Sequence, residues 1–252
     1  MRKGLTWLVC LIFGSLLALI VYCWALDQIL SDHHTKIVKE SNNQATYRMG
    51  QICIEADCER AVILVGNIDA DFQTMVRQLA ASKFEGVAWV CLRSPGGDIG
   101  IAMESASLIA KQKMNTCVVP VEPGVKEPNS PCASSCLYIF AAGERRVIDK
   151  TSVLGIHPSL IGVEKCYLPC NFAQRMTGET KTWLAADKHG LGQHPLINRL
   201  NAETHAHEPT SILRPTDFHT VTPSEYIEWG LATQKDLIDN GRFVLDESKK
   251  SP

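Results

Sequence analysis

Residues 131–159 read PCASSCLYIFAAGERRVIDKTSVLGIHPS, and this stretch predicts both the fold and the chemistry of the chain. Ser134 stands at the start of an apolar, helix-like segment, and His157 stands at the end of a strand-like one. Upstream, residues 94–97 read SPGG after another apolar strand, and the backbone amides of such a turn can hold an oxyanion. A nucleophile, a base and an oxyanion site together indicate the chemistry of a serine hydrolase.

The sequence around this stretch alternates between strand-like and helix-like patterns. Alternation of this kind favours parallel strand pairing through right-handed crossovers, so the expected fold class is α/β with a mainly parallel sheet. The expected strands are residues 60–66, 87–92, 117–121, 146–148 and 153–157, and the expected helices are 71–84, 99–113, 134–142, 180–188 and 223–231.

The N-terminus has the pattern of a membrane segment. Arg2 and Lys3 precede an uncharged run over residues 4–26, which is close to the roughly 20 apolar residues that a helix needs to cross a bilayer. The basic residues before it favour an N-terminus inside the cell. We therefore expect one N-terminal transmembrane helix, with a cleaved signal peptide as the alternative. Both interpretations export the rest of the chain.

The chain of 252 residues divides by composition into an anchor or signal over residues 1–27, a polar stalk over 28–50, one domain over 51–240 and a polar tail over 241–252. Its net charge is only -2, with 25 basic and 27 acidic residues. A chain so nearly balanced offers no basic surface for nucleic acid, so we expect no nucleic-acid partner.

Eight of the ten cysteines lie beyond the apolar N-terminal run, which suits an oxidising compartment. The three close pairs are the disulfide candidates: Cys53 with Cys58, Cys132 with Cys136, and Cys166 with Cys170. Cys91 and Cys117 lie in apolar strand-like runs, where burial as free thiols is the alternative to a disulfide. No pair has the tight spacing common in structural zinc sites, so disulfides are favoured and no metal is expected.

Four segments occur in a distinctive order: LRSPGGDIGIAMESASLI at 92–109, CASSCLYIFAAGERRV at 132–147, SVLGIHPS at 152–159 and PSEYIEWGLAT at 223–233. In this order and spacing they resemble the Clp protease/crotonase superfamily, particularly the proteolytic subunit of the Clp protease. The resemblance implies repeated β-β-α units around a mainly parallel sheet. It also implies that Ser134 is the nucleophile and His157 the base, with the amides of Gly97 and Ser135 as the oxyanion hole. Ser135 is the alternative nucleophile.

The third member of the triad departs from the pattern of this superfamily. Counting back from the closing helix gives Phe218 at the acidic position, and the adjacent Asp217 is the nearest carboxylate. Asp217 is therefore the expected third residue, with Asp187 or a dyad without a carboxylate as alternatives. A serine–lysine pair, as in related signal-peptide peptidases, would need a lysine such as Lys150 beside Ser134.

An exported domain has no supply of ATP, so no ATPase partner is expected. The resemblance then implies a cofactor-free, ATP-independent serine peptidase that acts on polypeptides outside the cytoplasm and forms a homo-oligomer. The expected location is the inner membrane with the domain in the periplasm, or a secreted form if the N-terminal segment is cleaved. The alternative is a catalytically inactive fold that serves as an oligomeric interaction scaffold. Acyl-CoA chemistry is disfavoured because export separates the domain from the CoA pool.

Overall fold

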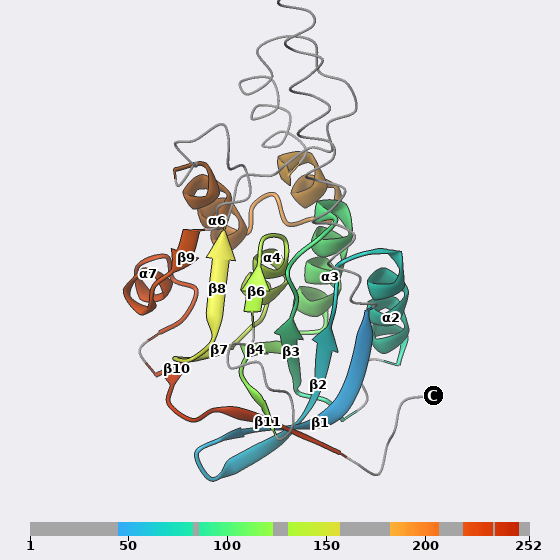
Figure 1. Cartoon of the computed structure of the whole chain (residues 1–252). Coiled ribbons are helices and arrows are strands. Elements are labelled where there is room, and N and C mark those ends of the chain that lie inside the picture. The colour runs from blue at the N-terminus through green and yellow to red at the C-terminus, as the bar shows by residue number, and fades with distance from the viewer. Residues whose placement is uncertain are drawn as a thin grey trace, which may run out of the picture. The chain divides into compact units, whose positions relative to one another are not determined.

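A mixed but mostly parallel sheet forms the centre of the structure (Figure 1), a computed structural model that describes residues 45–82, 86–122, 131–156, 182–206, 219–233 and 235–246. All of these residues belong to one compact unit. In spatial order, the eight described strands of this sheet are β10 (Leu237–Ile238), β7 (Arg146–Asp149), β4 (Asn115–Val118), β3 (Trp89–Arg93), β2 (Asp57–Val65), β1 (Thr46–Ile54), β11 (Arg242–Leu245) and β5 (Val121–Glu122).

The strands from β2 through β3, β4 and β7 to β10 pair in parallel. Only β1 runs against its neighbours, because it forms a hairpin with β2 on one side and pairs antiparallel with β11 on the other. The expected α/β class with a mainly parallel sheet is confirmed.

The folded unit extends beyond residues 51–240 at both ends. Strand β1 begins at Thr46, inside the segment predicted as a stalk, and β11 lies inside the predicted tail. The side chains of β1 alternate between exposed and partly buried up to Met49, which hides the strand from a search for apolar runs. Both strands are anchored by burial, since Ile52 is 1% exposed and Phe243 is 0% exposed.

Two helices, α2 (Ala70–Ala81) and α3 (Ile99–Lys111), cover one face of the sheet (Figure 1). Each begins at an aspartate whose carboxylate accepts backbone amides: Asp69 caps α2 and Asp98 caps α3. Phe72 of α2 and Met103 of α3 are fully buried against the sheet. Burial of such a side chain stabilises the fold by about 1.5–3 kcal/mol. Because both helices are capped and packed against the sheet, the turns that end at Asp69 and Asp98 are held in place.

A smaller sheet joins β6 (Pro131–Ala133), β8 (Val153–Ile156) and β9 (His219–Val221). Strand β6 leads into the short helix α4 (Cys136–Ala141), and β9 leads into α7 (Pro223–Glu228). Residues 182–188 are helical, in line with the helix expected there.

One helix, α6 (Pro195–Ala206), was not expected from the sequence. Its buried side chains are sparse, with Ile197, Leu200 and Thr204 facing the core. Such a narrow apolar stripe in a polar segment gives little periodic signal.

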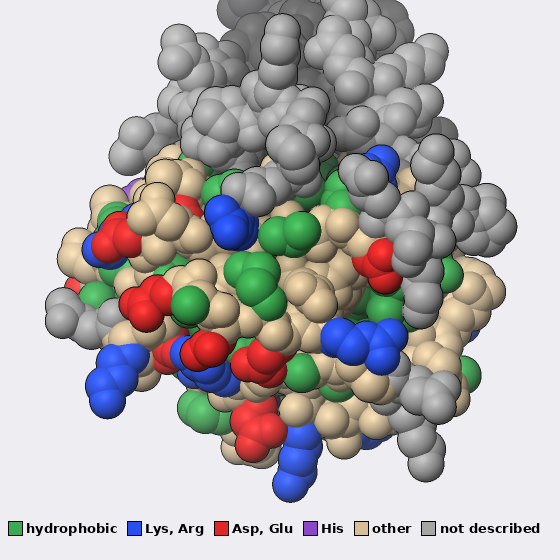
Figure 2. All heavy atoms as spheres, turned by 90° about the horizontal axis from the view of Figure 1, so that it is seen from below, with side chains coloured by type: hydrophobic (Ala, Val, Ile, Leu, Met, Phe, Trp, Pro, Cys, Tyr) green, Lys and Arg blue, Asp and Glu red, His purple; other side chains and the backbone are tan. Residues whose placement is uncertain are grey.

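Charged side chains of both signs are interspersed over the face of the molecule shown in Figure 2. This distribution agrees with the near-neutral net charge. Within the described residues, no helix is both long and apolar enough to cross a membrane. The predicted transmembrane segment lies outside those residues.

Candidate active site

Ser134 occupies a sharp turn between strand β6 and helix α4. Its φ angle is +56°, in the left-handed region that side chains other than glycine rarely adopt. Its amide donates a 2.8 Å hydrogen bond to the carbonyl oxygen of Gly155 in β8. A left-handed serine between a strand and a helix is the geometry by which hydrolases expose a nucleophilic hydroxyl. This conformation costs about 1–3 kcal/mol and persists only where surrounding structure enforces it.

Strand β6 is fixed on both sides. It pairs in parallel with β8, where Cys132 lies opposite Leu154. On the other side, the backbone of Ser94 donates to Pro131 O at 2.9 Å and accepts from Ala133 N at 3.0 Å. The turn that carries Ser134 is therefore the continuation of a strand held between two neighbours.

The glycine turn after β3 packs directly against Ser134. Gly96 and Gly97 both have positive φ angles, +104° and +152°. A Cβ atom on Gly96 would lie 2.6 Å from the Cβ of Ser134, and one on Gly97 would lie 2.3 Å from Ile68 O. Ser94 orders the turn from within, because its buried hydroxyl accepts the Gly96 amide at 3.1 Å. Ser94 is a supporting residue that the sequence analysis did not single out.

The turn leaves the polar backbone groups of Gly97 for other partners. The turn pairs with Ile68 through the residues on either side of Gly97. The Ile68 amide donates to Gly96 O at 2.9 Å, and the Asp98 amide donates to Ile68 O at 2.8 Å. The Gly97 carbonyl accepts the hydroxyl of Ser135 at 3.1 Å. Among the described residues, the amides of Gly97 and Ser135 donate to no acceptor. The structure thus brings together Ser134, Ser135 and Gly97, the three described members of the predicted site.

The described residues form three disulfides: Cys53–Cys58, Cys91–Cys117 and Cys132–Cys136. The second joins a pair that was not among the three candidates, and it rules out the alternative of free buried thiols at these positions. Cys91 in β3 and Cys117 in β4 are direct partners in the parallel ladder, with a Cα–Cα distance of 4.3 Å. Two cysteines at this register position are close enough to be joined. The third candidate pair, Cys166 and Cys170, lies outside the described residues.

The predicted base and acid also lie outside the described residues, and only the strands that lead to them are placed. Strand β8 ends at Ile156, so His157 is the next residue of the chain. Ile156 pairs with His219, the first residue of β9. Phe218 immediately precedes His219 in the sequence, and Asp217 precedes Phe218.

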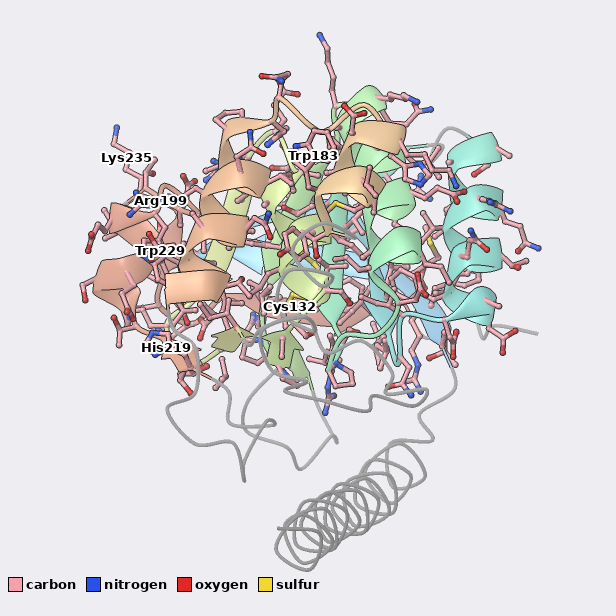
Figure 3. The ribbon with its side chains drawn as sticks, turned by 90° about the horizontal axis from the view of Figure 1, so that it is seen from above. Cys132, Trp183, Arg199, His219, Trp229 and Lys235 are labelled. Carbon is pink, nitrogen blue, oxygen red and sulfur yellow. A yellow bond between two sulfur atoms is a disulfide. The ribbon has the colours of Figure 1, made fainter. Side chains whose placement is uncertain are left out.

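His219 and Glu225 form a polar pair that the sequence analysis missed. The Nε2 atom of His219 lies 2.9 Å from Oε1 of Glu225, and the rings of His219 and Trp229 are 6.3 Å apart between centroids (Figure 3). Burial opposes ionisation of Glu225. Hydrogen bonds from the amide and hydroxyl of Thr222 and from His219 outweigh this effect, and lower the pKa of Glu225 to about 2.

The signal for this pair was present in the sequence as TPSE at residues 222–225, which is a helix capping box. Thr222 caps α7 and Glu225 reaches back to the Thr222 amide. The capping box fixes the start of α7. Because Glu225 of the box also contacts His219, it helps to hold β9, the strand that pairs with the end of β8.

Lys150 does not approach Ser134. It lies in the turn between β7 and β8, where its Nζ pairs with Asp239 at 2.7 Å. This turn precedes β8, whereas Ser134 follows the strand that runs parallel to β8, so they lie at opposite ends of the sheet. Asp187 lies at the end of the helical segment 182–188. Its carboxylate lies close to Gly192, since a Cβ added to that glycine would be 3.0 Å from Asp187 Oδ1. In the described part of the chain, no three potential ligands gather around a metal position.

Comparison with known proteins identifies no family for this chain. No protein-family model matches the sequence, and no curated protein matches it either. Among solved structures, the chain is similar to a mutant form of the 1510-N membrane-bound stomatin-specific protease. The TM-score is 0.45 and the identity 13%, over 69% of this chain and 76% of that one. At this level of similarity, nothing about activity follows from it.

Proposed function

We propose that this protein is a serine peptidase of Clp/crotonase-like fold, with Ser134 as its nucleophile. The observation that carries the proposal is the left-handed Ser134 in the turn from β6 to α4, in contact with the glycine turn at Gly96. A helix cap would not need this conformation, because capping serines adopt extended backbone angles. Ser135, the helix-capping position itself, directs its hydroxyl to Gly97 O instead of to the helix.

In the proposed reaction, Oγ of Ser134 attacks the carbonyl carbon of a peptide bond and His157 takes its proton. The negative charge that develops on the carbonyl oxygen is held by the amides of Gly97 and Ser135, which have no acceptor among the described residues. His157 then returns the proton to the leaving amine. Water hydrolyses the acyl-enzyme by the same route.

We propose Asp217 as the carboxylate that orients His157. Its support is its sequence position two residues before His219, the residue of β9 that pairs with the end of β8. His219 itself is engaged with Glu225, so we assign that pair to holding β9 and α7 in place. The reaction requires no metal or cofactor.

We also propose that the domain acts outside the cytoplasm. Three disulfides among the described residues are typical of an oxidising compartment. The apolar N-terminal run would anchor the protein in the inner membrane, or be cleaved after export. In a compartment without ATP, the substrates would be unfolded, short or membrane-tethered polypeptides, taken up by a homo-oligomer without an ATPase partner.

Labelling with a fluorophosphonate probe tests the proposal on the full chain in detergent. Attack by an activated serine displaces fluoride and leaves the probe bound to that serine. We expect labelling of the wild type at Ser134, and none in Ser134→Ala or His157→Ala. The matched control is Ser107→Ala, because Ser107 is a buried serine away from the turn and its hydroxyl donates to His189 O at 2.7 Å.

Equal labelling of Ser134→Ala and the wild type would overturn the assignment of the nucleophile. A folded wild type that neither labels nor cleaves peptides would reject peptidase activity. That second outcome would favour the alternative function, a non-catalytic interaction scaffold, especially if the protein assembles into oligomers.

A further inference from the structure

Helix α4, which follows the candidate nucleophile, lacks the usual device that fixes a helix start. It has six residues, and in the described part of the chain no side chain caps its first turn. Ser135 stands at the capping position with helical backbone angles, and its hydroxyl bonds to Gly97 instead. The burial of all six helix residues and one further restraint therefore set the angle between β6 and α4.

The Cys132–Cys136 disulfide supplies this restraint. It joins the residue two before Ser134 to the residue two after it, with 5.4 Å between the Cα atoms. Both cysteines are fully buried, and Cys132 is labelled in the interior of the molecule in Figure 3. Cys132 is fixed in β6 by its pairing with Leu154 and its bridge to Ser94. The bond therefore ties a rigid strand to the start of the helix across the serine.

A short covalent loop of this kind limits the backbone angles open to the residue at its centre. Serine disfavours the left-handed region, so without the bond the turn can relax toward more common angles. Such relaxation would move both the Ser134 hydroxyl and the Ser135 amide, which lies within the same loop. These are the groups whose placement matters most for attack and for charge stabilisation.

We propose, on the basis of the proposed function, that the Cys132–Cys136 disulfide is a positioning element that makes the nucleophile of this enzyme conditional on oxidation. The enzyme would be poorly active with the two thiols reduced, and would gain full activity once the bond forms outside the cytoplasm. The bond forms by thiol–disulfide exchange with a disulfide oxidant: the two cysteine thiols become one protein S–S bond, and their two electrons and two protons reduce the S–S bond of the oxidant to two thiols. No other oxidant is required.

The other disulfides provide internal controls. Cys91 and Cys117 are also fully buried, but they belong to a second core cluster with Trp89 and Phe243, distinct from the cluster that contains Cys132 and Cys136. Cys53 and Cys58 join the two strands of the β1–β2 hairpin. Loss of either bond should affect stability without moving Ser134.

The experiment compares full-length Cys132→Ala/Cys136→Ala with Cys91→Ala/Cys117→Ala and with the wild type. For each, the rate of fluorophosphonate labelling and the kcat and KM for peptide hydrolysis are measured. We expect the first variant to lose about 10- to 100-fold in kcat and in labelling rate, since misplacement by about 1 Å can cost 100-fold. Its KM should be unchanged. The second variant should keep the wild-type kcat even if it unfolds at a lower temperature.

A second measurement applies if Cys132→Ala/Cys136→Ala does not fold. The folded wild type is treated with increasing dithiothreitol, and mass spectrometry gives both the reduced fraction of Cys132 and the labelled fraction of Ser134. Labelling should fall as Cys132 becomes reduced, and oxidised glutathione should restore it. Labelling that is independent of the state of Cys132, or equal kcat in the two double variants, would overturn the inference. A wild type that never labels would instead reject the proposed function.

Discussion

The α-carbon of Gly96 lies so close to Ser134 that a methyl group added to it would stand 2.6 Å from the Cβ of the serine and 3.1 Å from its Oγ. The glycine turn and the nucleophile turn therefore form one packed unit, although 38 residues separate the contacting pair Gly97 and Ser135 in the sequence.

Gly96→Ala should abolish most activity. The new methyl group meets backbone and Cβ atoms that cannot move away, and φ at this position is +104°. We expect a loss of about 100-fold or more in the labelling rate of Ser134, as for a displacement of about 1 Å. Gly100→Ala is the control, because its Cβ would meet only the carboxylate tip of Asp98 at 3.1 Å. Wild-type labelling of Gly96→Ala would contradict the packing described here.

Ser135→Ala should retain measurable activity, unlike Ser134→Ala. The change removes the 3.1 Å hydrogen bond to Gly97 O but keeps the backbone amide of residue 135. A lost hydrogen bond of this kind is worth about 0.5–1.5 kcal/mol, or roughly 2- to 10-fold in rate. Peptide hydrolysis and probe labelling measure the effect. Complete loss of labelling in Ser135→Ala, with labelling retained in Ser134→Ala, would make Ser135 the nucleophile.

Glu225 should contribute to stability in a defined range of pH. Its folded pKa is about 2, below its ordinary value of 4.5, so the folded state favours its ionised form. The contribution is therefore fully present above about pH 4.5 and is lost as the pH falls toward 2. The difference in unfolding free energy between the wild type and Glu225→Gln, measured by urea titration, should follow this course. A difference that stays constant from pH 6 to pH 2.5 would show that ionised Glu225 has no such role.

The Cys91–Cys117 bond should stabilise the fold more than the Cys53–Cys58 bond. The Cys91–Cys117 bond closes a loop with a sequence separation of 26 residues, and the Cys53–Cys58 bond closes one with a separation of 5. Chain entropy then gives about 3.6 kcal/mol for the longer loop and about 2 kcal/mol for the shorter one. Urea unfolding of the two Cys→Ala double variants, followed by the fluorescence of buried Trp89, measures both values. A larger loss for Cys53→Ala/Cys58→Ala would reverse the expected order.

The local elements of the site were largely predictable from the sequence. An apolar run that ends in SPGG predicts a strand and a glycine turn, and the contact of Gly97 with Ser135 agrees with the grouping of these residues. The left-handed angle of Ser134 was not predictable. It accompanies close packing against Gly96, and serine by itself has no preference for it.

Features that depend on strand register escaped the sequence analysis. The Cys91–Cys117 bond requires β3 and β4 to pair so that these two residues face each other, and apolar patterns do not specify register between parallel strands. The pair of His219 with Glu225 differs, because only six residues separate its members and the capping box at residues 222–225 was an overlooked local signal.

The position of β11 has a practical consequence for preparing this protein. The strand lies between β1 and β5, so it closes a gap in the sheet rather than extending its edge. Expression of residues 51–240 alone would delete β11 and half of β1, and would uncover the main-chain edges of β2 and β5 as sites for self-association. An expressed fragment should therefore run from residue 45 through residue 246, and an affinity tag should be placed beyond those limits.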